Sequence, residues 1–286
     1  MTRVDVRKTA KLYINGAFVR SESGRVYAVE HADGSTVVRV SQGSRKDLRD
    51  AVRGSRAAQT GWAERSGYNR GQIMYRIAEI MEDRRDNFID RLLTGGFTAE
   101  AANAELDASI DRLVWYAGWA DKFTQVFGNM NPVAGPFFNI SAPEPTGVVG
   151  LLFAHESSLL GLISRLSPII VSGNTVVVVV AGPRPLAAVA FTEVLATSDV
   201  PPGVVNIITG LAEELGPVLA KHMDVNAIDI VGTSDELATS LVRDAAENVK
   251  RVTVATQPGF ADESAQSPYL IAKFVETKTV WHPKGV

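Results

Sequence analysis

A dense polar cluster, His155-Glu156-Ser157-Ser158, follows a short apolar run that has the composition of a buried strand. Side chains of these types can act in nucleophilic or acid–base chemistry. Ligand sites of open α/β sheets lie at the carboxyl ends of the strands, which is where this cluster is expected. Adjacent residues of one loop rarely converge on one atom, however, and a serine before Leu159 also makes a good helix N-cap. The cluster is therefore either a reactive cleft or simply the start of a helix.

Other residues with reactive side chains are sparse. His31, His222 and His282 stand far apart, and no metal-ligand spacing links them. The 286 residues include no cysteine, which excludes disulfides, thiolate metal sites and a cysteine nucleophile within this sequence. The sequence thus predicts no metal site.

The elements that must position the cluster are centred on a run of five valines, residues 176–180. The run is too short to span a membrane, and its β-branched residues favour a strand. Gly173 and Gly182 bracket the run, which disfavours the alternative of a buried helical turn. A strand that is apolar at every position is buried on both faces, as in a parallel sheet covered by helices.

Similar short apolar runs alternate with segments of helical period. The predicted strands are residues 148–153, 176–180, 204–208, 227–231 and 251–255. The predicted helices between them are residues 157–171, 185–196, 212–222 and 235–248. Strands that alternate with single helices form a parallel sheet. We therefore predict an α/β fold with a doubly wound, Rossmann-like parallel sheet.

Segments on either side of this core complete the predicted organisation. The first part combines a hairpin turning at Asn15-Gly16 with amphipathic helices, the first of which opens with a capping box from Ser44 to Asp47. A β-rich tail ends the sequence, and its strand, residues 270–281, must pair with something. The predicted segments are 1–128 (hairpin and helices), 129–145 (an extended strand), 146–255 (the core), 256–268 (a polar linker) and 269–286 (the tail).

Composition limits the classes of function. With 29 basic and 32 acidic residues the formal net charge is −3, which gives no electrostatic argument for binding nucleic acid or an anionic membrane surface. The N-terminus is polar and charged, without an apolar signal segment, and no apolar run has transmembrane length. We therefore expect a cytoplasmic protein that binds neither nucleic acid nor membrane.

Several motifs, taken in order, resemble the aldehyde dehydrogenase family. The resemblance runs from about residue 11 to residue 255 and rests on Lys11–Val19, Gly61-Trp62, Tyr116-Ala117-Gly118-Trp119, Glu144-Pro145-Thr146-Gly147-Val148-Val149-Gly150, Gly173-Asn174-Thr175-Val176-Val177, Pro202-Gly203-Val204-Val205-Asn206 with Thr209-Gly210, and Lys250-Arg251-Val252-Thr253. The tail, Phe274-Val275-Glu276-Thr277-Lys278-Thr279-Val280-Trp281, resembles the family's C-terminal oligomerisation strand. The resemblance implies a protruding β oligomerisation element, with residues 129–145 as its first strand segment and residues 269–286 as its C-terminal strand. A whole catalytic domain lies between these parts in a full-length member, and only a short linker lies there in this chain.

The departures from the family's pattern fall on its chemistry. The resemblance places the general-base glutamate at Ala255, which cannot accept a proton, and the oxyanion-stabilising asparagine at Glu156. A carboxylate at that position repels a developing oxyanion. The family's lysine and glutamate that contact the adenosine ribose fall at Val179 and Gly182. We therefore expect no catalytic residues of the family kind and a pseudoenzyme.

Generic features of a nucleotide site remain. Gly232-Thr233 opens a helix after a strand, and Gly210 precedes another helix, so backbone N–H groups there could meet a phosphate. A G-x-G-x-x-G fingerprint is absent, and the glycines could equally serve tight strand-to-helix turns. Gly210, Gly232 and Thr233 are the candidate residues for binding NAD or NADP, although no cofactor is required.

Three functional hypotheses follow. In the leading one, the chain is a non-catalytic subunit whose tail binds a full-length aldehyde dehydrogenase, giving a hetero-oligomer in which it stabilises, scaffolds or regulates. In the second, an autonomous dinucleotide-binding protein or enzyme uses the cleft at residues 155–158. In the third, the tails pair in a structural homo-oligomer. The predicted interface residues are Phe138, Ile140, Phe274, Val275, Val280 and Trp281.

Overall fold

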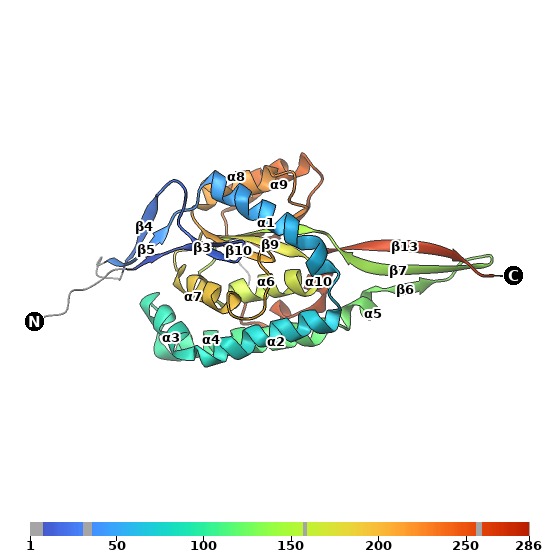
Figure 1. The fold of residues 1–286 in the computed structure, drawn as a ribbon, viewed down its shortest axis with the longest axis horizontal. Helices are drawn as coiled ribbons and strands as arrows, with labels where there is room; N and C mark the ends of the chain where they lie inside the picture. Colours follow the sequence, from blue (N-terminus) through green and yellow to red (C-terminus); the bar gives the residue numbers. More distant parts are fainter. Residues whose placement is uncertain (1–7, 31–35, 157–158, 256–258, 286) are drawn as a thin grey trace, which may run out of the picture.

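The computed structural model describes residues 8–30, 36–156, 159–255 and 259–285. At its centre is a seven-stranded sheet in the order β12-β11-β8-β9-β10-β2-β3 (Figure 1). Five strands are parallel, and the hairpin of β2 and β3 adds to one edge in antiparallel fashion. The strands are β2 (Leu12–Ile14), β3 (Ala17–Val19), β8 (Val148–Phe153), β9 (Thr175–Val180), β10 (Val205–Thr209), β11 (Ala227–Val231) and β12 (Arg251–Ala255). The predicted doubly wound parallel sheet is confirmed.

Helices cover both faces of this sheet because β9 is buried on both sides. Val176, Val178 and Val180 belong to one hydrophobic core, and Val177 and Val179 belong to the other. One face is covered by α1 (Arg45–Ala63), α8 (Ala212–Lys221) and α9 (Asp235–Ala246), and the other by α6 (Leu160–Val171) and α7 (Leu186–Leu195) (Figure 1). Outside α6 and α7 lies a further layer of α2 (Gly67–Asp83), α3 (Arg85–Thr94) and α4 (Ala99–Trp119).

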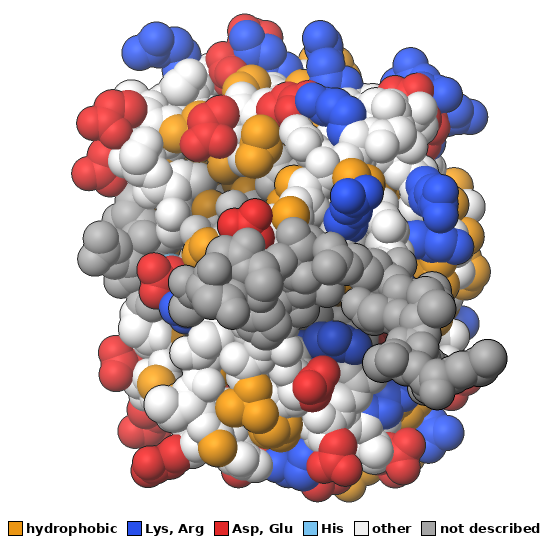
Figure 2. Space-filling view, turned by 90° about the vertical axis from the view of Figure 1, so that its left-hand side faces the viewer, with side chains coloured by type: hydrophobic (Ala, Val, Ile, Leu, Met, Phe, Trp, Pro, Cys, Tyr) orange, Lys and Arg blue, Asp and Glu red, His pale blue; other side chains and the backbone are white. Residues whose placement is uncertain are grey.

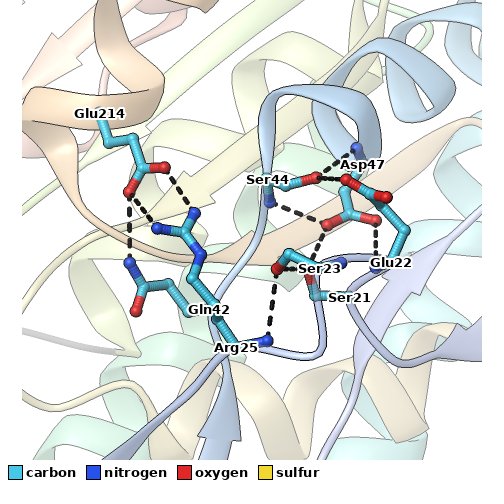
Figure 3. A network of polar contacts seen from close by, with 8 residues as sticks. All are labelled: Ser21, Glu22, Ser23, Arg25, Gln42, Ser44, Asp47 and Glu214. Atoms are coloured by element: carbon cyan, nitrogen blue, oxygen red, sulfur yellow. Dashed lines mark hydrogen bonds and ion pairs between the residues drawn. The ribbon is translucent and has the colours of Figure 1, made fainter.

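The N-terminal region matches its local sequence signals. Asn15 and Gly16 have positive φ angles of 51° and 76°, as the predicted hairpin turn requires. The predicted capping box also forms, since the Asp47 carboxylate accepts from the Ser44 N–H at 2.8 Å and the Ser44 hydroxyl accepts from the Asp47 N–H at 3.3 Å. Asp47 also accepts from the Ser21 hydroxyl, which fixes the preceding loop to α1 (Figure 3).

A small sheet beside this loop was not predicted from the sequence. It has the order β1-β5-β4 and is formed by β1 (Thr9–Ala10), β4 (Val26–Glu30) and β5 (Thr36–Ser41). Arg25, next to β4, forms an ion pair with Glu214 on α8, and Gln42 donates to the same carboxylate at 3.2 Å (Figure 3). These contacts hold the small sheet against the helical layer.

A three-stranded antiparallel sheet in the order β13-β7-β6 projects from the globule (Figure 1). It consists of β6 (Asn129–Asn131), β7 (Phe137–Pro145) and β13 (Val275–Pro283). β13 pairs with β7 along its whole length, from Val275 opposite Pro145 to Pro283 opposite Phe137. The tail strand therefore finds a pairing partner within its own chain along one of its edges.

Two predictions about the tail are corrected. The strand predicted over 270–281 begins only at Val275, because Ser267 caps a short helix, α10 (Pro268–Ala272), that has proline at its first position. Phe274 and Val275, predicted as interface residues, are buried in the chain's own core with exposed fractions of 1% and 7%. The Phe274 carbonyl accepts from the Asn174 amide at 2.7 Å. Phe138, Ile140, Val280 and Trp281 are exposed.

Helix α9 ends at a strained residue, which yields a stability prediction. Val249 has a φ of 56° and is 91% exposed, and the helix end is closed by a bond from the Lys250 N–H to the Ala245 carbonyl. A β-branched residue resists this left-handed conformation, which glycine adopts without strain. Val249→Gly is expected to raise the free energy of unfolding by about 0.5–1 kcal/mol in urea denaturation. Val249→Ala retains the Cβ and should gain less. Equal gains would contradict the strain.

Lys250 yields a prediction for pH dependence. Burial lowers its pKa to about 8 from the ordinary 10.5, and its side chain donates to Asn248. Because the unfolded chain holds this proton more tightly than the folded chain, stability should rise as pH increases from 8 toward 10.5. In Lys250→Met that rise should be absent, and at pH 7 the variant should match or exceed the wild type in stability. Parallel stability curves for the two proteins from pH 7 to 10 would contradict the shift.

Candidate functional site

The strand order reverses at the place, here called the crevice, where open α/β sheets bind their ligands. β8 lies between β9, which follows it in the chain, and β11, which comes later, so the order reverses between β8 and β11. Ligands of open α/β sheets bind outside the carboxyl ends of strands at such a reversal. His155 and Glu156 follow β8, and Gly232 and Thr233 follow β11. The structure thus brings His155 and Glu156 of the predicted polar cluster close to two predicted cofactor residues, while Ser157 and Ser158 lie outside the described residues.

The backbone of His155 is packed between two glycine turns. A Cβ on Gly232 would lie 2.8 Å from the His155 nitrogen, and a Cβ on Gly182 would lie 2.6 Å from the His155 carbonyl oxygen. Gly232 also has a φ of 73°. Both positions therefore need glycine for close approach of the backbone, which supports the interpretation that these glycines serve tight turns.

The other predicted cofactor residues are less favourably placed. Gly210 follows β10, two strands away from β8, and packs against Leu215 of α8. Thr233 is 8% exposed, and its hydroxyl oxygen has no hydrogen-bond partner among the residues that the structure describes. Val179 is fully buried in the core beneath α1 and α8, so its side chain does not reach the crevice.

An aromatic side chain from the predicted linker covers His155. The rings of His155 and Phe260 lie 5.0 Å apart at 89°, and Phe260 also packs against Phe153. A Cβ on Gly161 would lie 2.8 Å from the Phe260 ring. Burial lowers the pKa of His155. The sequence analysis missed this contact because Phe260 is an isolated aromatic residue in a polar stretch, yet it is buried.

Arg112 of α4 holds the segment that carries Phe260. Its guanidinium donates to the Phe260 carbonyl, the Ala265 carbonyl and the Gln266 side chain, each at 3.0 Å. It also donates to the Ser164 hydroxyl on α6 at 2.7 Å. The Tyr116 hydroxyl, one turn further along α4, donates to the Ser267 carbonyl. Residues 259–267 are therefore an anchored segment that includes a 3-10 turn, η1 (Glu263–Ala265), and they do not form an open linker.

A buried ion pair lies deeper in the sheet. Arg165 of α6 donates to Asp229 of β11 at 2.7 Å and 2.5 Å, and Thr253 of β12 donates to the same carboxylate. Ala255, the last residue of β12, has only a methyl side chain at the position to which the family resemblance assigns the general base. Glu156 is exposed. We find no convergent catalytic set among the described residues around the crevice.

The carboxyl ends of the parallel strands lie on the face seen in Figure 2. Acidic and basic side chains are interspersed over it, as the near-balanced composition leads one to expect. Within the described parts of the chain, no group of three or more His, Asp or Glu residues is arranged to hold a metal ion. No helix in those parts is long and apolar enough to cross a membrane.

Comparison with known proteins identifies the family. The model of the aldehyde dehydrogenase family matches residues 18–257. This chain belongs to the aldehyde dehydrogenase family. It is 33% identical over 264 residues to cytosolic aldehyde dehydrogenase 1 of Elephantulus edwardii, covering 89% of this chain and 51% of that protein. It is 33% identical over 255 residues to retinal dehydrogenase 2 of Mus musculus, covering 86% and 48%.

Solved structures agree with this assignment. The NAD+ complex of an aldehyde dehydrogenase from Bacillus cereus superposes with a TM-score of 0.82 at 25% identity, covering 86% of this chain and 50% of that one. An aldehyde dehydrogenase structure from Burkholderia cenocepacia gives 0.82 at 26%, with the same coverage. The chain thus spans about half the length of the relatives it matches. Since the family match ends at residue 257, it does not reach β13, whose likeness to the family's oligomerisation strand stays a prediction.

The anchoring role of Arg112 can be tested by substitution. Arg112→Met removes four hydrogen bonds and leaves buried acceptors without a donor, which should lower the free energy of unfolding by about 3 kcal/mol. Limited proteolysis should cut residues 259–267 faster in the variant. Arg76→Met, which breaks an exposed pair with Glu79 on α2, is the control and should change stability by less than about 0.5 kcal/mol. Equal proteolysis of all three proteins would refute the anchor.

Proposed function

We propose that this chain is a non-catalytic subunit of the aldehyde dehydrogenase family that binds a full-length aldehyde dehydrogenase through its projecting sheet. In the complex it acts as a scaffold, stabiliser or regulator. The observation that carries the proposal is the projecting sheet of β6, β7 and β13, which exposes a row of apolar side chains on one face.

The unsuited positions support the non-catalytic half of the proposal. The sequence has no cysteine for a thiol nucleophile. Ala255 has no group that can accept a proton, and the exposed carboxylate of Glu156 disfavours an oxyanion near it. In each of these three respects the chain lacks a group that the resemblance assigns to catalysis, and this supports a non-catalytic role.

One face of the projecting sheet supports the binding half. Met130, Ile140 and Val280 stand opposite one another across the three strands and are 66%, 49% and 51% exposed. Phe138 lies on the same face, two residues from Ile140, and Lys284 lies 4.9 Å from its ring. An apolar row on a projecting element is typical of a surface that a partner covers.

The opposite face of the same sheet is mostly polar and already hydrogen-bonded. The Asn131 amide donates to Asn139 and Ser141, and the Ser141 and Thr279 hydroxyls share a bond of 2.8 Å. Trp281 lies near the free end of this face and packs on Phe137. This difference between the faces supports a contact on the face of Ile140 and Val280.

Backbone pairing offers a second contact. β13 is the edge strand of its sheet, so its outer edge is unpaired within the part of the chain that the structure describes. An extended segment of a partner can add to such an edge by main-chain hydrogen bonds. The same features would serve two copies of this chain, and a structural homo-oligomer is therefore the second candidate.

The proposal is tested by mixing the purified chain with a purified full-length aldehyde dehydrogenase of its own source organism and measuring native mass. A hetero-oligomer of fixed ratio is expected. The double variant Ile140→Asp and Val280→Asp should weaken it at least tenfold, because two carboxylates would be desolvated in the contact. Phe274 and Val275 are unsuitable test positions, since they lie in the chain's own core.

Thr277→Asp is the matched control, on the same strand but the opposite face, and should leave the complex intact. Recovery of the chain only as a self-assembled species would transfer support to the structural homo-oligomer. If the double variant forms the complex as tightly as the wild type, the proposed contact through Ile140 and Val280 is wrong.

A further inference from the structure

The crevice at the carboxyl ends of β8 and β11 is the place where a dinucleotide would be sought. The first group there that would attract a phosphate is the N-terminus of α6, which follows β8. Its cap residue, Leu159, has no side-chain acceptor for the first N–H groups. The Glu105 carboxylate, reaching across from α4, accepts from the Leu159 N–H at 3.3 Å and the Leu160 N–H at 3.0 Å. An anion of the chain itself therefore already occupies this helix end.

The N-terminus of the second helix at the crevice, α9, is also capped by side chains of this chain. The Ser234 hydroxyl accepts from the Leu237 N–H at 3.3 Å. Asp235 and Glu236 place two carboxylates in the first turn, where they interact favourably with the helix dipole. The same two charges oppose a phosphate at that position.

The two positions that the resemblance assigns to ribose contacts, Val179 and Gly182, carry no polar side chain. Val179 turns its side chain into the core, and Gly182 has no side chain to offer a ribose hydroxyl. The space beside Gly182 and Gly232 is taken by the backbone of His155, and the Phe260 ring packs on the His155 ring. Burying ribose hydroxyls without hydrogen-bond partners would cost about 1–3 kcal/mol for each group.

From these contacts we infer that the crevice is closed from within and that this chain does not bind NAD or NADP. Glu105 takes the place of an anionic ligand at α6, and Phe260, held by Arg112, takes the place of a ligand ring over His155. The residues present do not fit the dinucleotide that the family implies. The inference is independent of the proposed subunit role, since a complex could form with or without a nucleotide.

Two measurements test the inference. Calorimetric titration of the wild-type chain with NAD and with NADP up to 1 mM should give no saturable heat, while a full-length aldehyde dehydrogenase under the same conditions shows that binding is detectable. Hydrogen exchange of the Leu159 and Leu160 amides should be at least tenfold faster in Glu105→Ala, because both amides lose their acceptor. Unfolding of that variant should begin about 2–4 °C lower.

Asp111→Asn removes an exposed carboxylate from the same helix and is the matched control, for which exchange at both amides should be unchanged. Glu105→Gln keeps an acceptor of the same size and should give an intermediate rate, so it serves if the alanine variant does not fold. A saturable heat for either nucleotide overturns the inference. Exchange at Leu159 and Leu160 that is equally slow in the wild type and Glu105→Ala overturns it as well. Neither result depends on whether a hetero-oligomer forms.

Discussion

The burial of β9 on both faces is the constraint from which the rest of this structure follows. A strand of valines supplies apolar side chains to two cores at once, so helices must cover each side of the sheet. On one side α6 does this, and every residue of that helix is buried. In a helix buried so completely, the backbone N–H and C=O groups at the ends cannot form hydrogen bonds with water. Other elements of the chain must supply those partners.

Helix α4 supplies them, and it also connects α6 to the segment 259–267 near the end of the chain. Glu105 caps the start of α6, and Arg112, two turns further on, joins Ser164 of α6 to the segment of Phe260. The same helix face thus meets the polar needs of α6 and fixes the segment 259–267 that leads to the tail. The family resemblance predicts a whole domain at this point of the chain. The contacts of Arg112 explain how the short segment found there has a defined position on the globule.

Local signals in the sequence were sufficient for the core and insufficient for its connections. The strand and helix alternation, the Asn15-Gly16 turn and the Ser44 capping box depend on residues close in sequence, and all of them formed as predicted. Phe274 was misassigned because its side chain joins a core cluster formed with α6 and β9, which are about one hundred residues away in the sequence. Phe260 and Glu105 have no periodic pattern around them, and their roles appear only when α4 and α6 are side by side.

The projecting sheet shows why a strand can be paired internally and still present a binding surface. Its root is fixed to the globule, since Arg251 of β12 forms two hydrogen bonds with Glu276 and the Phe274 carbonyl is held by Asn174. Its polar face is satisfied by bonds among Asn131, Asn139, Ser141 and Thr279. On the other face, Lys278 pairs with Glu144, whereas the apolar side chains of Met130, Ile140 and Val280 are exposed. Because the root is fixed and the exposed apolar row lies on one face, the sheet limits the directions from which a partner could approach that row.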